Sequence, residues 1–96
     1  MFGKQEDSCF KINKGKIAYR IINSEAVILN LDNGIYYSLN KTGALIWQLI
    51  EKGNDLEEIS GHLAEKFDAK EEVVKKDIKA LIVDLAKENL IEKISK

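Results

Sequence analysis

The chain has 96 residues, of which 45% are hydrophobic and 32% are charged, and 15 Lys and Arg oppose 16 Asp and Glu for a net charge of −1. This length suits one domain with a single hydrophobic core. The even charge balance argues against a dedicated nucleic-acid-binding protein, because such proteins use surplus basic residues to neutralise phosphates. No apolar run approaches the roughly 20 residues that a membrane-spanning helix needs, so no membrane association is expected.

The N-terminal segment has no targeting pattern. Residues 1–9 are polar and aperiodic, so we expect a flexible arm there and a single domain over residues 10–96. The first residues, MFGKQEDS, contain no apolar signal-peptide region, and one cysteine, Cys9, cannot form an internal disulfide. Both features indicate a reducing, cytoplasmic setting.

Three short segments rich in Val, Ile and Tyr predict an antiparallel β-meander. The segments are residues 16–22, 25–31 and 35–39. Asn23-Ser24 can form a tight turn between the first two segments. Asn33-Gly34 is the stronger hairpin signal, because a type I′ turn needs positive φ at both of its central residues.

The hydrophobic period changes after Leu39, where apolar residues begin to recur every three or four positions. The expected helices cover residues 40–53, 55–67 and 68–90, with a short extended segment at 90–94. Asn40 should cap the first helix, and Asp55 with Glu58 makes a capping-box-like start for the second. Asn89 can adopt the left-handed conformation that ends a helix. The predicted fold is α+β, a three-stranded meander followed by three α-helices, similar to a winged helix-turn-helix.

Catalytic chemistry has few candidates in this sequence. The only histidine, His62, lies within a helix and has no nucleophile to pair with. Cys9 lies away from any basic cluster that would activate a thiol. One Cys and one His do not make a conventional zinc site, and no glycine-rich phosphate loop is present. We therefore expect no enzymatic activity and no cofactor.

DNA binding is an alternative, because a winged helix-turn-helix docks its last two helices on DNA. The third expected helix carries the basic residues Lys70, Lys75, Lys76 and Lys79. It also carries acidic residues that would repel phosphates, among them Glu71, Glu72, Asp77 and Asp84. Arginine, the usual reader of guanine edges, occurs once, at Arg20. A solvated helix face of mixed charge explains this pattern better than a DNA interface.

The strand segment at residues 35–39 carries no charge, although it is expected at the edge of the meander. Both outer strands of a three-stranded sheet have unpaired backbone groups, which charged side chains usually protect. Lys16 and Arg20 protect the first strand in this way. Side chains alternate along a strand, so Tyr36 should face away from the inward set, which is Ile35, Tyr37 and Leu39.

The third helix has more apolar positions than one core stripe needs. The expected core stripe consists of Val74, Ile78, Leu81 and Leu85. Ile82 and Val83 widen the apolar arc, and with Ile78 and Lys79 they would form a second, partly exposed face. An uncharged strand edge beside such a face can capture an extended peptide by β-augmentation. Cover of this edge by the N-terminal arm or by a dimer mate also fits the pattern.

Residues 26–53 resemble the core signature of the PqqD family. They read AVILNLDNGIYYSLNKTGALIWQLIEKG, similar to the family's strand, its D-x-G-x-Y-Y turn and strand, and its L-N-x-T-G-x-x-I-W block. Residues 77–91 resemble the family's third helix and its ending, with Asn89 where the family usually has glycine. Asn tolerates the same left-handed conformation. The resemblance runs from about residue 16 to residue 92.

The resemblance implies a RiPP precursor peptide recognition element. Such a domain is non-catalytic and binds the leader segment of a ribosomally made precursor peptide, which it presents to a modifying enzyme. In the family, the leader adds as a strand to the third strand and packs against the third helix. The residues that correspond here are Ile35, Tyr36, Tyr37, Ser38, Leu39, Val74, Lys75, Ile78, Lys79 and Ile82. In this position Lys75 and Lys79 would favour acidic leader residues.

Two subgroups of the family have stand-alone domains of this length. One is the carrier protein of pyrroloquinoline quinone (PQQ) biosynthesis, which works with a radical SAM enzyme. The other is the discrete leader-binding protein of lasso-peptide systems, which works with a separate leader peptidase. The compact chain and its tight D-N-G turn favour the second. The expected protein is a monomer or a weak homodimer, with a precursor peptide rather than a nucleic acid as its partner.

Overall fold

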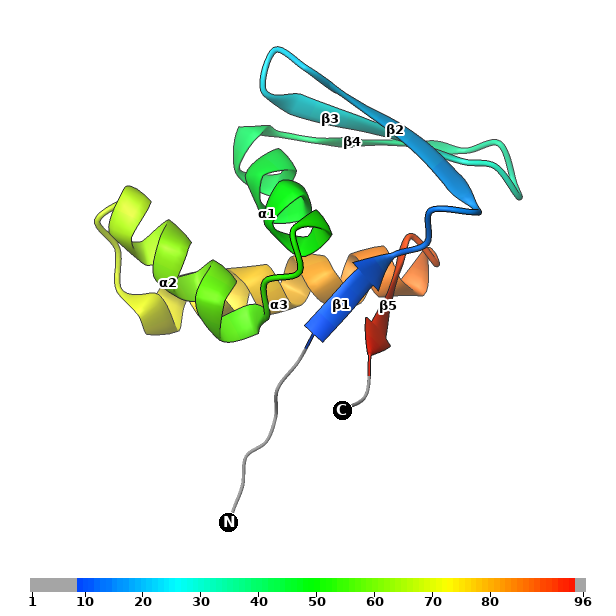
Figure 1. Ribbon diagram of the computed structural model, residues 1–96. Coiled ribbons are helices and arrows are strands. Elements are labelled where there is room, and N and C mark those ends of the chain that lie inside the picture. The colour runs from blue at the N-terminus through cyan, green and yellow to red at the C-terminus, as the bar shows by residue number, and fades with distance from the viewer. Residues whose placement is uncertain (1–8, 95–96) are drawn as a thin grey trace.

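Figure 1 shows the computed structural model, which describes residues 9–94. The elements in chain order are β1 (Cys9–Ile12), β2 (Ile17–Ile22), β3 (Glu25–Asn30), β4 (Tyr36–Leu39), α1 (Lys41–Glu51), α2 (Leu56–Lys66), α3 (Glu71–Lys87) and β5 (Ile91–Ile94). Strands β2, β3 and β4 form a three-stranded antiparallel sheet, and the three helices follow it along the chain. The predicted α+β class and element order are confirmed.

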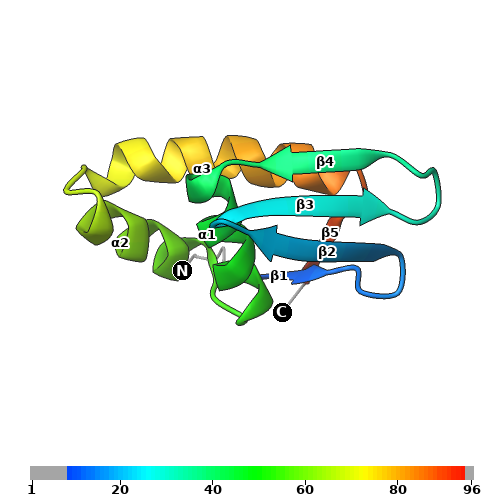
Figure 2. The same ribbon diagram turned by 90° about the horizontal axis from the view of Figure 1, so that it is seen from above.

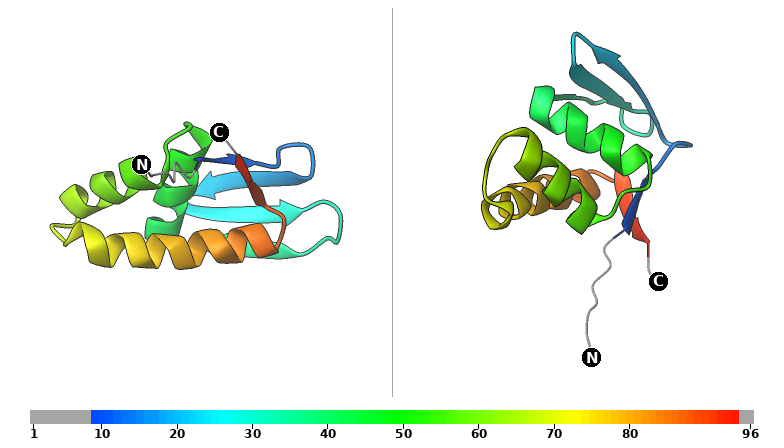
Figure 3. Two further views of the ribbon diagram at one scale, coloured as in Figure 1. Left: turned by 90° about the horizontal axis from the view of Figure 1, so that it is seen from below. Right: turned by 60° about the vertical axis from the view of Figure 1, so that its left-hand side comes forward.

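A second, two-stranded sheet joins the two ends of the described chain. Strand β1 pairs antiparallel with β5, so that Cys9 lies opposite Ile94 and Ile12 lies opposite Ile91 (Figure 3, right). Cys9 therefore belongs to a strand and not to the flexible arm predicted over residues 1–9, of which residues 1–8 lie outside the described part. Ile12 and Ile91 are both buried. This pairing closes the core beside the C-terminal end of α3.

Of the two hairpin turns, the first forms as predicted and the second differs from the prediction. Asn23 and Ser24 have positive φ values of 53° and 69°, as a two-residue type I′ turn requires. At the second turn Gly34 has a φ of 74°, but Asn33 does not have a positive φ, so the predicted type I′ turn is absent there. The side chain of Asn30 organises this turn, because its Oδ1 accepts hydrogen bonds from the backbone N–H of Asp32 at 2.8 Å and of Asn33 at 3.3 Å.

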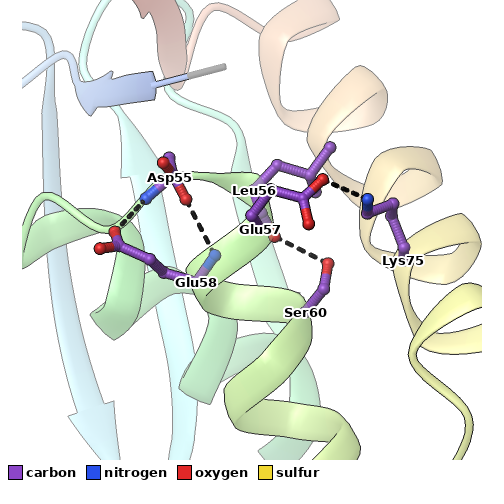
Figure 4. Close-up of polar contacts among 6 residues, drawn as sticks. All are labelled: Asp55, Leu56, Glu57, Glu58, Ser60 and Lys75. Carbon is purple, nitrogen blue, oxygen red and sulfur yellow. Dashed lines mark hydrogen bonds and ion pairs between the residues drawn. The ribbon is translucent and has the colours of Figure 1, made fainter. Parts of the chain in front are cut away.

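The helix ends follow the expected capping chemistry in most places. The Asn40 side chain accepts a hydrogen bond from the N–H of Gly43, and Asp55 forms a full capping box with Glu58 (Figure 4). Asn89 has a φ of 62° just after α3, as predicted. α3 begins at Glu71, three residues later than predicted, because Asp68 takes a positive φ of 52° in the turn after α2.

The hydrophobic core lies between the sheet and the helices. α1 lies between the three-stranded sheet on one side and α2 and α3 on the other (Figure 1). Trp47 of α1 is fully buried, and the ring of Tyr19 on β2 packs edge-on against it with centroids 5.2 Å apart. α2 and α3 contact each other through an ion pair between Glu57 and Lys75 (Figure 4). Among the residues that the structure describes, no helix is long and apolar enough to cross a membrane.

Candidate peptide-binding site

Strand β4 has a free edge. The sheet order β2-β3-β4 leaves β4 paired on one side only within the described residues. Asn30 N–H donates to Ile35 C=O at 2.9 Å, and hydrogen-bonded pairs alternate along an antiparallel ladder. The next such pair is therefore Ile28 with Tyr37. Consequently, Tyr36 and Ser38 direct their backbone N–H and C=O groups toward the free edge.

The side chains of β4 alternate between two surfaces. Tyr37 and Leu39 are half-buried and pack against the core, as predicted, whereas Tyr36 and Ser38 are exposed on the opposite face of the sheet. Ile35 was expected to point inward with Tyr37, but it precedes β4 and half of its surface is exposed. It belongs to the turn, because its N–H donates to the Asn33 side chain at 2.9 Å.

The outer face of the sheet has a shallow depression of about 330 Å³ that sequence reasoning missed. It is lined by Ala18, Tyr19, Arg20, Ile22, Val27, Leu29 and Tyr36. The side chain of Tyr36 is thus part of the outer face, while its backbone belongs to the free edge. The two neighbouring tyrosines of β4 therefore serve different surfaces.

Seen from above and from below, β4 overlaps the C-terminal half of α3 (Figure 2; Figure 3, left), and Figure 1 shows the two elements at different heights. Two hydrogen bonds connect the sheet to the end of this helix. The hydroxyl of Tyr37 donates to Glu88 Oε1 at 2.7 Å, and Asn30 Nδ2 donates to the backbone C=O of Glu88 at 3.2 Å. The Glu88 carboxylate, by accepting this bond, raises the pKa of Tyr37. We use the name β4–α3 groove for the surface formed by the free edge of β4 (Tyr36–Leu39) and the side of α3 that continues into Glu88.

The helix positions predicted for this groove fall elsewhere on α3. Ile78 and Ile82 are 1% and 6% exposed, so their side chains belong to the core. Lys75 pairs with Glu57 and so faces α2. At 100° per residue, Lys79 lies about 180° around the helix from Glu88, the residue that contacts β4. Of the predicted helix residues, only Val74 lies toward the groove.

The helix face beside β4 consists of other residues. At 100° per residue, Asp84, Leu81 and Asp77 lie with Glu88 within an arc of about 60° around the helix axis. Val74 lies next to this arc. Val74 and Leu81 are half-buried and pack against the core. Asp77 and Asp84 are exposed. The apolar pattern of the sequence contained Val74 and Leu81, but it could not tell their stripe from the adjoining stripe of Ile78, Ile82 and Leu85.

The residues considered for catalysis lie outside this groove. His62 is exposed on α2, and Cys9 is half-buried in β1. Within residues 9–94, the structure has no group of three or more His, Cys, Asp or Glu that could hold a metal ion. The chemistry that the groove offers is backbone hydrogen bonding along β4, with apolar contact at its floor.

Fold and site together define a winged-helix-like α+β domain that has an open sheet edge beside its third helix. Residues 25–91 match the family model described as coenzyme PQQ synthesis protein D (PqqD), and the chain belongs to this family. The family resemblance inferred from the sequence is thereby confirmed. Among curated proteins, none matches the chain.

Two solved structures are similar over nearly their whole length. TbiB1 in complex with the TbiA(beta) leader peptide has a TM-score of 0.82 and 29% identity, over 90% of this chain and 99% of that chain. A lasso peptide synthetase B1 complexed with the leader peptide has a TM-score of 0.76 and 27% identity, over 90% of this chain and 98% of that chain. Both of those proteins were solved with a leader peptide bound.

Proposed function

We propose that this protein is a non-catalytic leader-peptide-binding protein. It captures the leader of a ribosomal precursor peptide as an additional strand on β4, in the β4–α3 groove. The observation that carries this proposal is the open edge, where Tyr36 and Ser38 direct their backbone groups toward the groove. The membership of the chain in the PqqD family and its likeness to two leader-peptide complexes support it.

The groove explains how affinity and selectivity would be divided. Backbone hydrogen bonds from Tyr36 and Ser38 supply affinity that tolerates different leader sequences, and contacts to alternate side chains supply selectivity. Tyr37, Leu39 and Leu81 are half-buried and offer apolar contact at the floor. Each well-buried apolar anchor of the leader contributes about 1.5–3 kcal/mol. Ordering a disordered leader opposes binding, so micromolar to nanomolar dissociation constants are expected.

The partner enzyme follows from the pathway. One of the two similar structures is a lasso peptide synthetase B1 complexed with the leader peptide, which supports a lasso system for this protein. The partner enzyme in such a system would be a separate leader peptidase. A PQQ-type pathway with a radical SAM enzyme is the alternative within the family. In either pathway, holding leader and enzyme on one scaffold raises the effective concentration of the core peptide at the active site. In this proposal, the protein acts in the cytoplasm as a monomer or a weak homodimer.

The substitution Ser38→Pro tests edge capture directly. The backbone N–H of Ser38 points to the free edge of β4. Proline at this position therefore removes a hydrogen-bond donor for the added strand without removing a β3–β4 hydrogen bond. Fluorescence polarisation with the labelled leader of its precursor peptide should show binding to the wild type and at least a tenfold loss in the variant. Full affinity in a folded Ser38→Pro variant would contradict the proposal.

Ile21→Pro is the matched control. Leu31 N–H donates to Lys16 C=O at 2.9 Å, so the alternation directs the N–H of Ile21 toward the opposite edge of the sheet. This variant should keep the affinity of the wild type. Sedimentation at low concentration tests the alternative in which a second copy occupies β4, and a salt-dependent gel shift tests the DNA alternative.

A further inference from the structure

The lysines of α3 all lie outside the side of the helix that lies toward β4. Its four lysines are Lys75, Lys76, Lys79 and Lys87. At 100° per residue, all four lie about 100° or more around the helix from Glu88. Three carboxylates, those of Asp77, Asp84 and Glu88, instead fall on the side that lies beside β4. The groove wall is therefore acidic, which is the reverse of the charge expected when Lys75 and Lys79 were placed there.

None of these three carboxylates belongs to an ion pair in the part of the chain that the structure describes. Within residues 9–94 the ion pairs are Lys11 with Glu92 and Lys75 with Glu57, so neither Asp77 nor Asp84 takes part in one. Both side chains are exposed. The facing strand β4 carries no charge of its own.

The end of the helix strengthens the same field. Unpaired carbonyl groups give a helix C-terminus a partial negative charge, and Asp84 and Glu88 lie there. Asp32, in the turn before β4, is tied to this end, because Asn30 contacts both the N–H of Asp32 and the C=O of Glu88. A peptide strand bound in the groove would therefore lie between these negative charges and the free backbone groups of β4.

From this arrangement, and resting on the proposed function, we infer that the groove selects a leader strand with basic side chains turned toward α3. Asp77 and Asp84 are separated by about 10 Å along the helix axis, since each residue rises 1.5 Å. A β-strand advances about 3.3 Å per residue, and every second side chain faces the same way. Residues two and four apart on one face of the strand are about 6.6 Å and about 13 Å from each other, distances that bracket the spacing of the two carboxylates. The long side chains of Lys or Arg at either spacing therefore reach both Asp77 and Asp84.

Selection from a library of random dodecapeptides by mRNA display tests this inference. The full chain is the target at low salt, and counter-selection on the Ser38→Pro variant removes peptides that do not use the edge of β4. The surviving peptides should be enriched in Lys or Arg at positions two or four apart. Edge-dependent peptides without basic residues would overturn the inference and leave the proposed function intact. Failure to recover any edge-dependent peptide would contradict the proposed function, and the inference with it.

Binding of a synthetic, fluorescein-labelled selected peptide supplies the second measurement. Double substitution Asp77→Asn/Asp84→Asn should weaken binding roughly 2- to 25-fold at low salt, as expected for two surface charge contacts. This loss should shrink at 0.5 M salt. The control Glu65→Gln/Glu72→Gln removes the same charge from exposed positions outside the groove and should change affinity less than twofold. Equal affinities for the two double variants would overturn the inference.

Discussion

Two alanine substitutions on α3, at Ile78 and at Leu81, should distinguish a residue of the core from a residue of the β4–α3 groove. Ile78 is 1% exposed and packs within the core, so Ile78→Ala leaves a cavity and should lower the free energy of unfolding by about 2–5 kcal/mol. For a domain of this size each kcal/mol shifts the melting temperature by about 4–8 °C, which gives a decrease of at least about 8 °C. Leader affinity, measured where the variant is still folded, should change little.

Leu81→Ala should behave in the opposite way. Leu81 is half-buried and lies beside β4, so its truncation should cost only about 1 kcal/mol of stability but remove apolar contact with the leader. We expect a 5- to 30-fold weaker leader affinity, which corresponds to about 1–2 kcal/mol. Thermal unfolding followed by circular dichroism at 222 nm, with fluorescence polarisation on the same samples, measures both quantities. A stable Ile78→Ala variant that has lost leader binding would refute this assignment of the helix faces.

Three further substitutions test the supports of the site. Asp55→Ala breaks the capping box with Glu58 and should cost about 0.5–2 kcal/mol in urea unfolding, so an unchanged midpoint would contradict the role of that cap. Asn30→Ala removes two accepted hydrogen bonds and one donated bond at a buried residue, and should cost at least about 2 kcal/mol and weaken leader binding as well. Because the pKa of Tyr37 is raised, its hydrogen bond to Glu88 contributes fully below pH 10 and is lost as pH rises through the folded-state value. The wild type should therefore lose stability relative to Tyr37→Phe as the pH rises above 10, whereas parallel pH profiles would show that this bond is unimportant.

Local chemistry made much of the fold predictable. The three strands of the meander, the caps at Asn40 and Asp55, and the left-handed stop at Asn89 all depend on residues close together in the sequence. The turn before β4 was harder to predict. The Asn33-Gly34 pair suits a type I′ turn, yet the buried side chain of Asn30 builds a different turn from three residues upstream.

Features that depend on distant contacts were not predictable. The β1–β5 pair joins residues at the two ends of the chain, and β1 contains only four residues with little alternation. On α3, the stripe with Ile78 and the stripe with Leu81 both repeat every three or four positions. Which stripe is buried depends on where α2 and the sheet pack, and the contacts of Lys75 and Glu88 reveal that placement only in the folded structure.

The three hydrogen bonds of the Asn30 side chain have a mechanical consequence for the groove. They link the turn that precedes β4 to the carbonyl of Glu88, the residue that follows α3, and so fix the separation of strand and helix at that end. At the other end Leu39 leads directly into α1, whose cap Asn40 holds the chain in place. The width of the β4–α3 groove is therefore set before any ligand binds. An incoming strand has to order itself, but the protein has little to rearrange, which keeps the conformational cost of binding on the peptide.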